Sequence, residues 1–395
     1  MSTQQVVLSP KEARRRLVNW LGLARSQGRG RRGVLSVLAR LRCIQLDPLD
    51  VIGTNADLVV MARVDGIGRG ELWQHLFPNH AFEHFAKERC ILPASAFPWY
   101  RDRGHAAQAP WWRHHEREQR IDRRITAALL AEIADHEGPV STEDLTDHGG
   151  IEPIDWSGWK GTARATSMAL EILWTRCDIV VCGRTARGSK LYDLPQRALG
   201  PVAKEKPEGD FDRWAIAERV RAAGLLSRAG GSNWSMLGQA RLSPVPDVMV
   251  QRGELVDVRI DGSPRRYLAT PEFLHSPLSR DDGRVRILGP LDPLLWDRSL
   301  VRHAFEFDYV WEVYKPAHLR KWGWYVCPLL EHDRLIGRID ARISDGLLAV
   351  RKLWLERDTD RNAVRLALER HAEAYRCRDV KLSAQARRSL DPVRA

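Results

Sequence analysis

The order of elements expected between residues 121 and 194 restricts the fold more than any other feature of the sequence. Apolar residues recur at helical spacing in two segments, and two β-rich segments then flank a turn that contains a glycine. The expected elements are a helix at 121–136, a short capped helix within 138–145, a helix at 166–176, and strands at 178–184 and 190–194. Three helices followed by a hairpin is the order of a winged helix, which is a helix-turn-helix with a β wing.

The same order recurs more weakly after residue 206, and strands dominate from Val285 onward. We expect a helix at 212–223, strands at 248–260 and 265–268, further strands at 306–314, 324–330, 334–342 and 347–354, and a final helix at 362–376. The predicted fold class is α+β, with tandem winged-helix domains and a small C-terminal antiparallel β unit. The predicted domains are 1–110, 111–205, 206–284 and 285–395.

The charge balance favours a polyanionic partner. The 395 residues include 62 Lys and Arg against 51 Asp and Glu, which gives a net charge of +11. Nucleic acid is therefore the first expectation and an anionic membrane surface the second. No stretch of about 18 apolar residues is present, so we expect a cytoplasmic protein without a membrane span.

Gln45 and Asp47 form the most informative local pattern. They stand two residues apart within the run Arg40–Asp50, which is otherwise largely apolar, and Pro48 disfavours a helical conformation for Asp47. In an extended backbone, side chains two apart point to the same side. A carboxylate can activate water and an amide can orient it, so the pair suits chemistry on a polyanion. The alternative is structural, with Asp47 capping the turn that follows α-helical residues 34–41.

Basic and aromatic residues elsewhere are candidates for contacts with DNA. Residues 25–33 are expected to form a flexible basic loop, the hairpin at 184–190 a basic wing, and residues 320–325 a basic and aromatic surface. The candidate contacts are Arg29, Arg31, Arg32, Arg184, Arg187, Lys190, Arg320, Lys321, Trp324 and Tyr325. The alternatives are solvated loops for the cations and core positions for the aromatic residues.

Neither metal sites nor disulfides are expected. His80 and His84 are four residues apart, but no third ligand is evident. The six cysteines are scattered and form no CxxC pair, which argues against a zinc ribbon. We predict a protein that uses no metal and no other cofactor.

The chain resembles the AlkZ/YcaQ-type winged-helix DNA glycosylases along most of its length. The resemblance rests on Gln45-Leu46-Asp47, Glu88, Leu92-Pro93, residues 291–298, residues 307–309 with Glu312, Tyr314 and Pro316, and residues 323–338. The chain departs from the pattern at Thr54-Asn55-Ala56 and at Lys87-Glu88-Arg89. The catalytic motif of one branch of that family is Gln-apolar-Asp, which this chain matches.

The resemblance implies hydrolysis of the N-glycosidic bond of N7-alkylated purines in double-stranded DNA, including unhooking of interstrand crosslinks. Gln45 and Asp47 would be the catalytic residues, and Glu88 would support the site. An N7-alkylated purine is already cationic, so it leaves without a general acid, and one carboxylate can both stabilise the sugar cation and direct water. The expected enzyme is monofunctional, monomeric and associated with the nucleoid, without an obligate protein partner.

A different class of protein shares the winged-helix order. A non-catalytic DNA-binding protein or transcription regulator would read bases with the third helix. That helix, at 166–176, is mostly apolar, with Arg164 and Arg176 at its edges, which is poor for base readout. A self-resistance glycosylase that acts on an antibiotic adduct is a further alternative and would differ only in its adduct.

Overall fold

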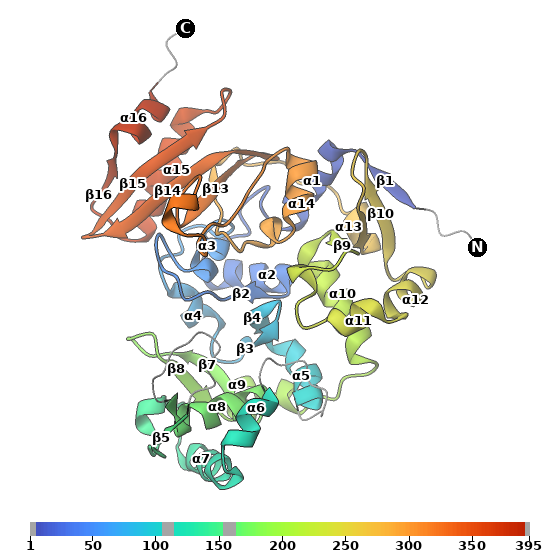
Figure 1. The fold of residues 1–395 in the computed structure, drawn as a ribbon, viewed down its shortest axis with the longest axis vertical. Coiled ribbons are helices and arrows are strands. Elements are labelled where there is room, and N and C mark those ends of the chain that lie inside the picture. The colour runs from blue at the N-terminus through green and yellow to red at the C-terminus, as the bar shows by residue number, and fades with distance from the viewer. Residues whose placement is uncertain (1–4, 105–113, 153–162, 392–395) are drawn as a thin grey trace. The chain divides into compact units, whose positions relative to one another are not determined.

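A computed structural model describes residues 5–104, 114–152 and 163–391 (Figure 1). The chain divides into two compact units, which we call unit 1 (Met1–Leu72 with Asp212–Ala395) and unit 2 (Trp73–Phe211). This grouping is coarser than the four predicted domains, whose boundaries stay a prediction. The predicted boundary at residue 110 lies outside the described residues.

The first two helices of unit 1 precede the segment that contains Gln45. Helix α1 (Pro10–Trp20) starts with a capping box, in which Ser9 and Glu12 bond each other's backbone N–H groups. Helix α2 (Gly30–Leu41) begins earlier than predicted, so the loop expected at 25–33 ends at Arg29. Gly33 makes this possible, because a Cβ there would lie 2.7 Å from Val64 and 3.0 Å from the backbone of Gly28.

A four-stranded sheet in unit 1 has the order β1-β10-β11-β9. Its strands are β1 (Val6–Leu8), β10 (Val256–Ile260), β11 (Arg266–Ala269) and β9 (Leu226–Ser227). The strands predicted at 248–260 and 265–268 correspond to β10 and β11, which form an antiparallel pair on either side of Asp261-Gly262. The strand predicted to start at residue 248 is wrong in its first half, because Val245–Gln251 forms helix α12 with a proline in its first turn.

A five-stranded sheet fills the C-terminal part of unit 1. Its order is β12 (Arg286–Ile287), β13 (Val326–Glu331), β14 (Arg334–Ser344), β15 (Leu347–Leu355) and β16 (Asp379–Leu382). Neighbours are antiparallel except β15 and β16, which run parallel. The purely antiparallel prediction fails there, because helix α15 (Arg361–Ala374) intervenes and returns the chain in the same direction. Helix α15 lies along this sheet (Figure 1), and its apolar residues belong to the same core as those of the strands.

The strand predicted at 306–314 is absent. Burial alternates as expected, since Phe307 and Tyr309 are buried and Asp308 and Val310 are exposed. The backbone, however, joins no ladder. It is held by the Tyr309 hydroxyl, which donates to the oxygen of Val326 (2.7 Å), and by Arg338, which donates to the oxygen of Asp308 (2.5 Å). The alternation of apolar and polar residues at 306–314 therefore indicates alternating burial of the side chains and not pairing with a neighbouring strand.

Unit 2 contains the predicted helices and hairpin. Helix α7 (Arg123–Asp135), a short 3-10 turn (Thr142–Asp144), helix α8 (Ala165–Thr175) and the antiparallel strands β7 (Val180–Arg184) and β8 (Lys190–Asp193) follow in the expected order. These elements are confirmed, and the tandem winged-helix arrangement stays a prediction. The other elements of unit 2 are β3 (Ala81–Ala86), β4 (Glu88–Pro93), α5 (Phe97–Gly104), α6 (His114–Arg120), β5 (Gly150–Ile151), β6 (Ala163–Arg164) and α9 (Pro195–Leu199).

The remaining α-helices and β-strands are short, apart from the 13-residue helix α10. They are β2 (Ile44–Gln45), α3 (Asn55–Met61), α4 (Glu71–Leu76), α10 (Phe211–Ala223), α11 (Gly238–Leu242), α13 (Pro271–His275), α14 (Arg298–Phe305) and α16 (Ala384–Leu390). A buried ion pair in unit 1 joins the end of α3 to the chain before α14. Arg63, just after α3, donates to both oxygens of Asp292 (2.7 and 3.0 Å), and both side chains are fully buried.

Candidate active site

The backbone of Gln45 is fixed by a buried asparagine. Gln45 ends strand β2, and only 7% of its surface is exposed. Asn55, the first residue of α3, donates from Nδ2 to the backbone oxygen of Gln45 (2.8 Å) and accepts at Oδ1 from the N–H of Leu291 (3.1 Å). The fully buried amide is thus paired through both its nitrogen and its oxygen. Asn55 therefore holds the motif in place.

Asp47 is half-buried and uses only part of its hydrogen-bonding capacity. Its Oδ1 accepts from the backbone N–H of Leu49 (2.9 Å), which closes the turn around Pro48. No Lys or Arg of the described residues forms an ion pair with it, so the carboxylate is not neutralised by a neighbour within that part of the chain. Burial raises the pKa of Asp47 above its ordinary value, and the Leu49 N–H opposes this shift. The turn-capping alternative is therefore supported, and it occupies one oxygen of the carboxylate, while the catalytic role of Asp47 stays a prediction.

The loop that follows Asp47 is tethered to the C-terminal part of unit 1. The oxygen of Val51 accepts from the N–H of Ile343 (2.9 Å), and the oxygen of Ile52 lies 2.6 Å from Nε2 of the buried His371 on α15. Burial lowers the pKa of His371 to about 4, so the ring is neutral near pH 7 and Nε2 carries the proton that it donates. Two hydrogen bonds to residues far along the chain therefore hold this loop.

Tyr325 and Tyr375 of unit 1 each have a buried hydroxyl group. Tyr325 has 1% of its surface exposed, so its predicted contact with DNA is not supported and we assign it to the core. Burial raises the pKa of Tyr325, and the neighbouring Cys327 and Asp47 add to the rise. The hydroxyls of Tyr325 and Tyr375 are buried without a hydrogen-bond partner among the described residues.

A buried glutamate organises the segment before Tyr325. The carboxylate of Glu312 accepts from the backbone N–H groups of Lys321 (3.1 Å) and Trp322 (2.7 Å) and pairs with Nζ of Lys315 (2.9 Å). Burial would raise the pKa of Glu312, but Lys315 and these N–H groups hold it at about 2. The sequence marked Glu312 only through its resemblance to the family. In the structure, the Glu312 carboxylate holds residues 312–323 in place by accepting hydrogen bonds from their backbone and pairing with Lys315.

This segment presents basic and apolar side chains at the surface. Tyr314 is 86% exposed and Leu319 is 60% exposed, which is unusual for side chains of this kind. Lys321 is exposed with Nζ 4.8 Å from the ring of Trp322, and the half-buried Arg320 donates to the oxygen of Lys315 (2.7 Å). Arg320 and Lys321 therefore stay candidates for phosphate contacts. Trp324 is half-buried and packs against the C-terminal core, which leaves it little surface for a wedge.

The three arginines at the start of α2 are all exposed. Arg29 precedes the helix, and Arg31 and Arg32 occupy its first turn. The backbone N–H groups at a helix N-terminus also attract anions. The prediction of phosphate contacts here is compatible with the structure, although the residues lie on a helix and not in a flexible loop.

The basic hairpin of unit 2 is largely neutralised by carboxylates. Arg184 pairs with the buried Glu83 and lies 4.4 Å over the ring of Trp73, and Lys190 pairs with Glu171 (2.7 Å). Although burial raises the pKa of Glu171, Lys190 and Arg89 hold it down to about 2. Arg187, at the exposed turn, makes no ion pair among the described residues. Two of the three predicted wing contacts are therefore engaged in folding unit 2.

Glu88 lies in the other unit from Gln45 and Asp47. It is exposed and takes a positive φ of 60° at the turn between β3 and β4 of unit 2. That conformation is uncommon for a residue other than glycine, asparagine or aspartate. Its predicted support of the site stays a prediction.

The described residues hold no group of three or more His, Cys, Asp or Glu side chains that could bind a metal ion. His80 and His84 do not share a helical face, because His84 lies within strand β3. The six cysteines are all free. Within the described ranges, none of the helices has the length and apolar character needed to cross a bilayer.

Comparison with known proteins identifies the family. The family model described as "DNA glycosylase AlkZ-like" matches residues 38–374, and the chain therefore belongs to the AlkZ-like DNA glycosylase family. Among solved structures, the chain is similar to Streptomyces sahachiroi DNA glycosylase AlkZ, with a TM-score of 0.59 and 18% sequence identity. The match covers 96% of this chain and 100% of that one, which shows a shared fold. Membership of the family makes this protein a DNA glycosylase, a hydrolase that acts on DNA in repair.

Proposed function

We propose that the protein hydrolyses the N-glycosidic bond of N7-alkylated purines in double-stranded DNA, interstrand crosslinks included, and that Asp47 directs the attacking water. The observation that carries this proposal is the state of Asp47. It is half-buried, its pKa is raised, one oxygen is held by Leu49, and no cation among the described residues pairs with it. A carboxylate in this state is a stronger base than one held in an ion pair.

The proposed reaction needs only water as a co-reactant. The bond between C1′ and the purine nitrogen breaks, and its electron pair neutralises the positive charge that alkylation placed on the base. The water oxygen bonds to C1′, and its proton passes to Asp47. The Gln45 amide would orient the water or the sugar. The product is a free base and an abasic site in an intact strand, so the proposed enzyme is monofunctional.

A crosslinked purine remains tied to the opposite strand. Rotation of the nucleotide by about 180° into a closed pocket is therefore hindered, and a site on the surface of unit 1 suits this substrate better than a deep one. Arg29, Arg31, Arg32, Arg320 and Lys321 are the proposed phosphate contacts of unit 1, and Arg187 is that of unit 2. We propose a monomer that acts at the nucleoid in the cytoplasm.

The test is release of a base from a defined lesion. Purified protein is incubated with duplexes that carry N7-methylguanine or a nitrogen-mustard crosslink, and abasic sites and unhooked strands are measured. We expect both products in wild-type protein without strand cleavage. Sequence-selective binding to undamaged DNA, with no base released from either substrate, would instead favour the transcription regulator.

A further inference from the structure

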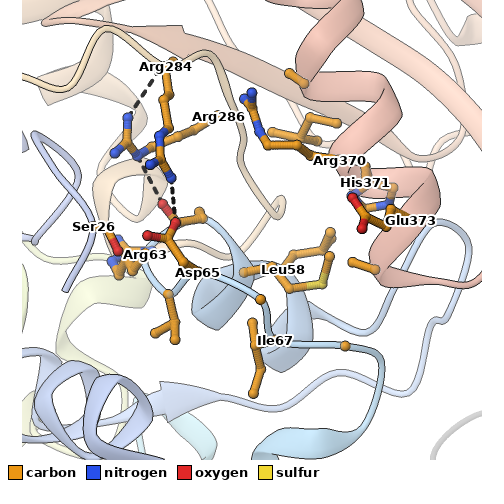
Figure 2. Close-up of a pocket in the computed structure, with 18 of the residues that line it drawn as sticks. Ser26, Leu58, Arg63, Asp65, Ile67, Arg284, Arg286, Arg370, His371 and Glu373 are labelled. Carbon is orange, nitrogen blue, oxygen red and sulfur yellow. Dashed lines mark hydrogen bonds and ion pairs between the residues drawn. The ribbon is translucent and has the colours of Figure 1, made fainter. Parts of the chain in front are cut away.

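Unit 1 contains a pocket of about 640 Å³ that the proposed reaction does not use (Figure 2). It lies between the end of α3 with the chain that follows it, the residues around β12, and one face of α15. Neither Gln45 nor Asp47 lines it. Its volume is within the range of about 300–1,000 Å³ that small-molecule sites occupy.

Arginines dominate the charged lining. Six arginines and three carboxylates line the pocket, and three of the arginines, Arg29, Arg370 and Arg376, make no ion pair with a carboxylate of the described residues. Of the carboxylates, Asp65 pairs with Arg284, and Glu71 accepts from the N–H of Gly68 (3.0 Å). The pocket therefore has three guanidinium groups without an ion-pair partner among the described residues, against two carboxylates of the lining, Glu71 and Glu373, that pair with no arginine there.

Two of the arginines are rigidly placed and face a third. Arg286 pairs with Asp282 (2.7 Å) and donates to the oxygen of Ala62 (2.9 Å), and Arg284 is held by Asp65. Within the described part of the chain, Arg370 donates only to the oxygen of Val285 (3.0 Å), and Figure 2 shows it on the opposite side of the pocket. Burial lowers the pKa of Arg370, and repulsion from Arg284 and Arg286 lowers it further. An anion between these groups would relieve that repulsion.

The rest of the wall is apolar. Leu58, Met61, Ile67 and Ile287 line the same cavity and offer no hydrogen-bonding side chain. A ligand that fits must therefore combine an anionic end with a flat or apolar body. Guanidinium groups bind phosphate oxygens in pairs, and an apolar wall accepts the ring of a base or the face of a sugar.

We propose that this pocket binds one nucleotide unit through its phosphate. The phosphate would lie between Arg370 and the Arg284–Arg286 pair, and the base or sugar would lie against the apolar wall. Phosphate of this kind could come from a free nucleotide or from a DNA strand. The proposal goes beyond the glycosylase reaction and does not depend on Asp47.

The test uses deoxyadenosine monophosphate and deoxyadenosine as probes, titrated into the full chain by calorimetry. We expect the monophosphate to bind at least about tenfold more tightly than the nucleoside, because charge-assisted bonds to phosphate supply the difference. Arg370→Glu should weaken binding of the monophosphate by at least about tenfold. Arg388→Glu, which reverses the charge of an exposed arginine on α16 outside the pocket, should leave it unchanged.

A second arm identifies the source of the phosphate. Affinity for an undamaged duplex is measured by fluorescence anisotropy with the same variants, after thermal unfolding has shown that they fold. If Arg370→Glu fails to fold, Arg376→Glu replaces it. Weaker duplex binding in the pocket variant alone, without binding of the monophosphate, assigns the site to a DNA phosphate and supports the proposal. Equal binding of both probes overturns it, as does the absence of probe binding together with unchanged duplex affinity. None of these readouts involves base release, so they are independent of the proposed reaction.

Discussion

The charged side chains of the Asp47 loop in unit 1 and of the β7–β8 hairpin in unit 2 differ in whether they form ion pairs. Asp47 is half-buried with a raised pKa, and no cation of the described residues pairs with it. On the hairpin, Arg184 and Lys190 each have a carboxylate partner, and the partner of Arg184 is fully buried. Both regions looked functional in the sequence because they concentrate polar residues beside apolar ones.

This difference distinguishes charged side chains that are available for a reaction from charged side chains whose ion pairs stabilise the fold. An ion pair satisfies both of its members, and a carboxylate held by a cation is a weaker base than one left alone. A half-buried charge without a partner is unfavourable for stability, so its presence points to a functional role. By this criterion we propose Asp47 as the reactive group and Arg187 as the residue of the hairpin that is most available to DNA.

The largest effect is expected at Asp47. Asp47→Asn keeps the shape and the Leu49 hydrogen bond but removes the base, so single-turnover base release should fall by about 10²–10⁴. Duplex affinity should not change, and the free energy of unfolding should stay equal or rise, because burial disfavours the charged form. Asp345→Asn, at an exposed turn between β14 and β15, is the matched control and should behave as wild type.

The next largest effect is expected at the hairpin, and it concerns stability. Arg184→Ala leaves Glu83 buried without its cation, so the free energy of unfolding should fall by on the order of 3 kcal/mol. Chemical denaturation followed by the fluorescence of the tryptophans measures this. Arg187→Ala is the control on the same hairpin and should change stability by less than about 0.5 kcal/mol. Equal stability of the two variants would show that the Arg184–Glu83 pair does not support the fold.

Asn55 holds the backbone of the Gln45-Leu46-Asp47 motif in place. Asn55→Ala removes the donor to Gln45 and the acceptor for Leu291, so we expect a loss of about 2 kcal/mol in the free energy of unfolding. The rate of base release should fall more than duplex affinity does, because the backbone of Gln45 is no longer fixed. Asn362→Ala, at an exposed position on α15, provides the comparison and should leave the rate unchanged.

The smallest effect is expected at Arg187. Arg187→Ala should weaken binding to an undamaged duplex severalfold and reduce the slope of log affinity against log salt by about 1. Anisotropy at several salt concentrations measures this slope. An unchanged slope would remove the hairpin from the DNA interface and leave DNA contacts to unit 1 alone.

The sequence predicted elements well where the signal is local. The helices predicted at 212–223 and 362–376 and the strand predicted at 265–268 correspond to α10, α15 and β11 of the structure. Residues 306–314 show the limit of such signals. Their alternation is real, but side chains far along the chain, such as Arg338, hold the backbone in place of a neighbouring strand.

Partners distant in sequence explain what could not be predicted at the site. Glu83 lies about a hundred residues before Arg184, and nothing in either segment indicates that they pair. Asn55 stands where the chain departs from its family pattern, and only the fold shows that it bonds to Gln45 and Leu291. The Gln45-Leu46-Asp47 motif was recognisable because the chemistry that we propose for it depends on a spacing of two residues within one segment.

The most direct test of the role of Asp47 is the pH dependence of base release. Single-turnover rates on an N7-methylguanine duplex are measured for wild-type and Asp47→Asn protein, after subtraction of the rate without protein. The active form is the carboxylate, so the wild-type rate should be highest above the pKa of Asp47 in the folded protein and fall as pH decreases through it. Because burial raises this pKa, the fall should occur above the ordinary value of about 3.9, and the residual rate of the variant should not show it. The same acid limb in both proteins, or full activity in the variant, would contradict the assignment of Asp47 as the base.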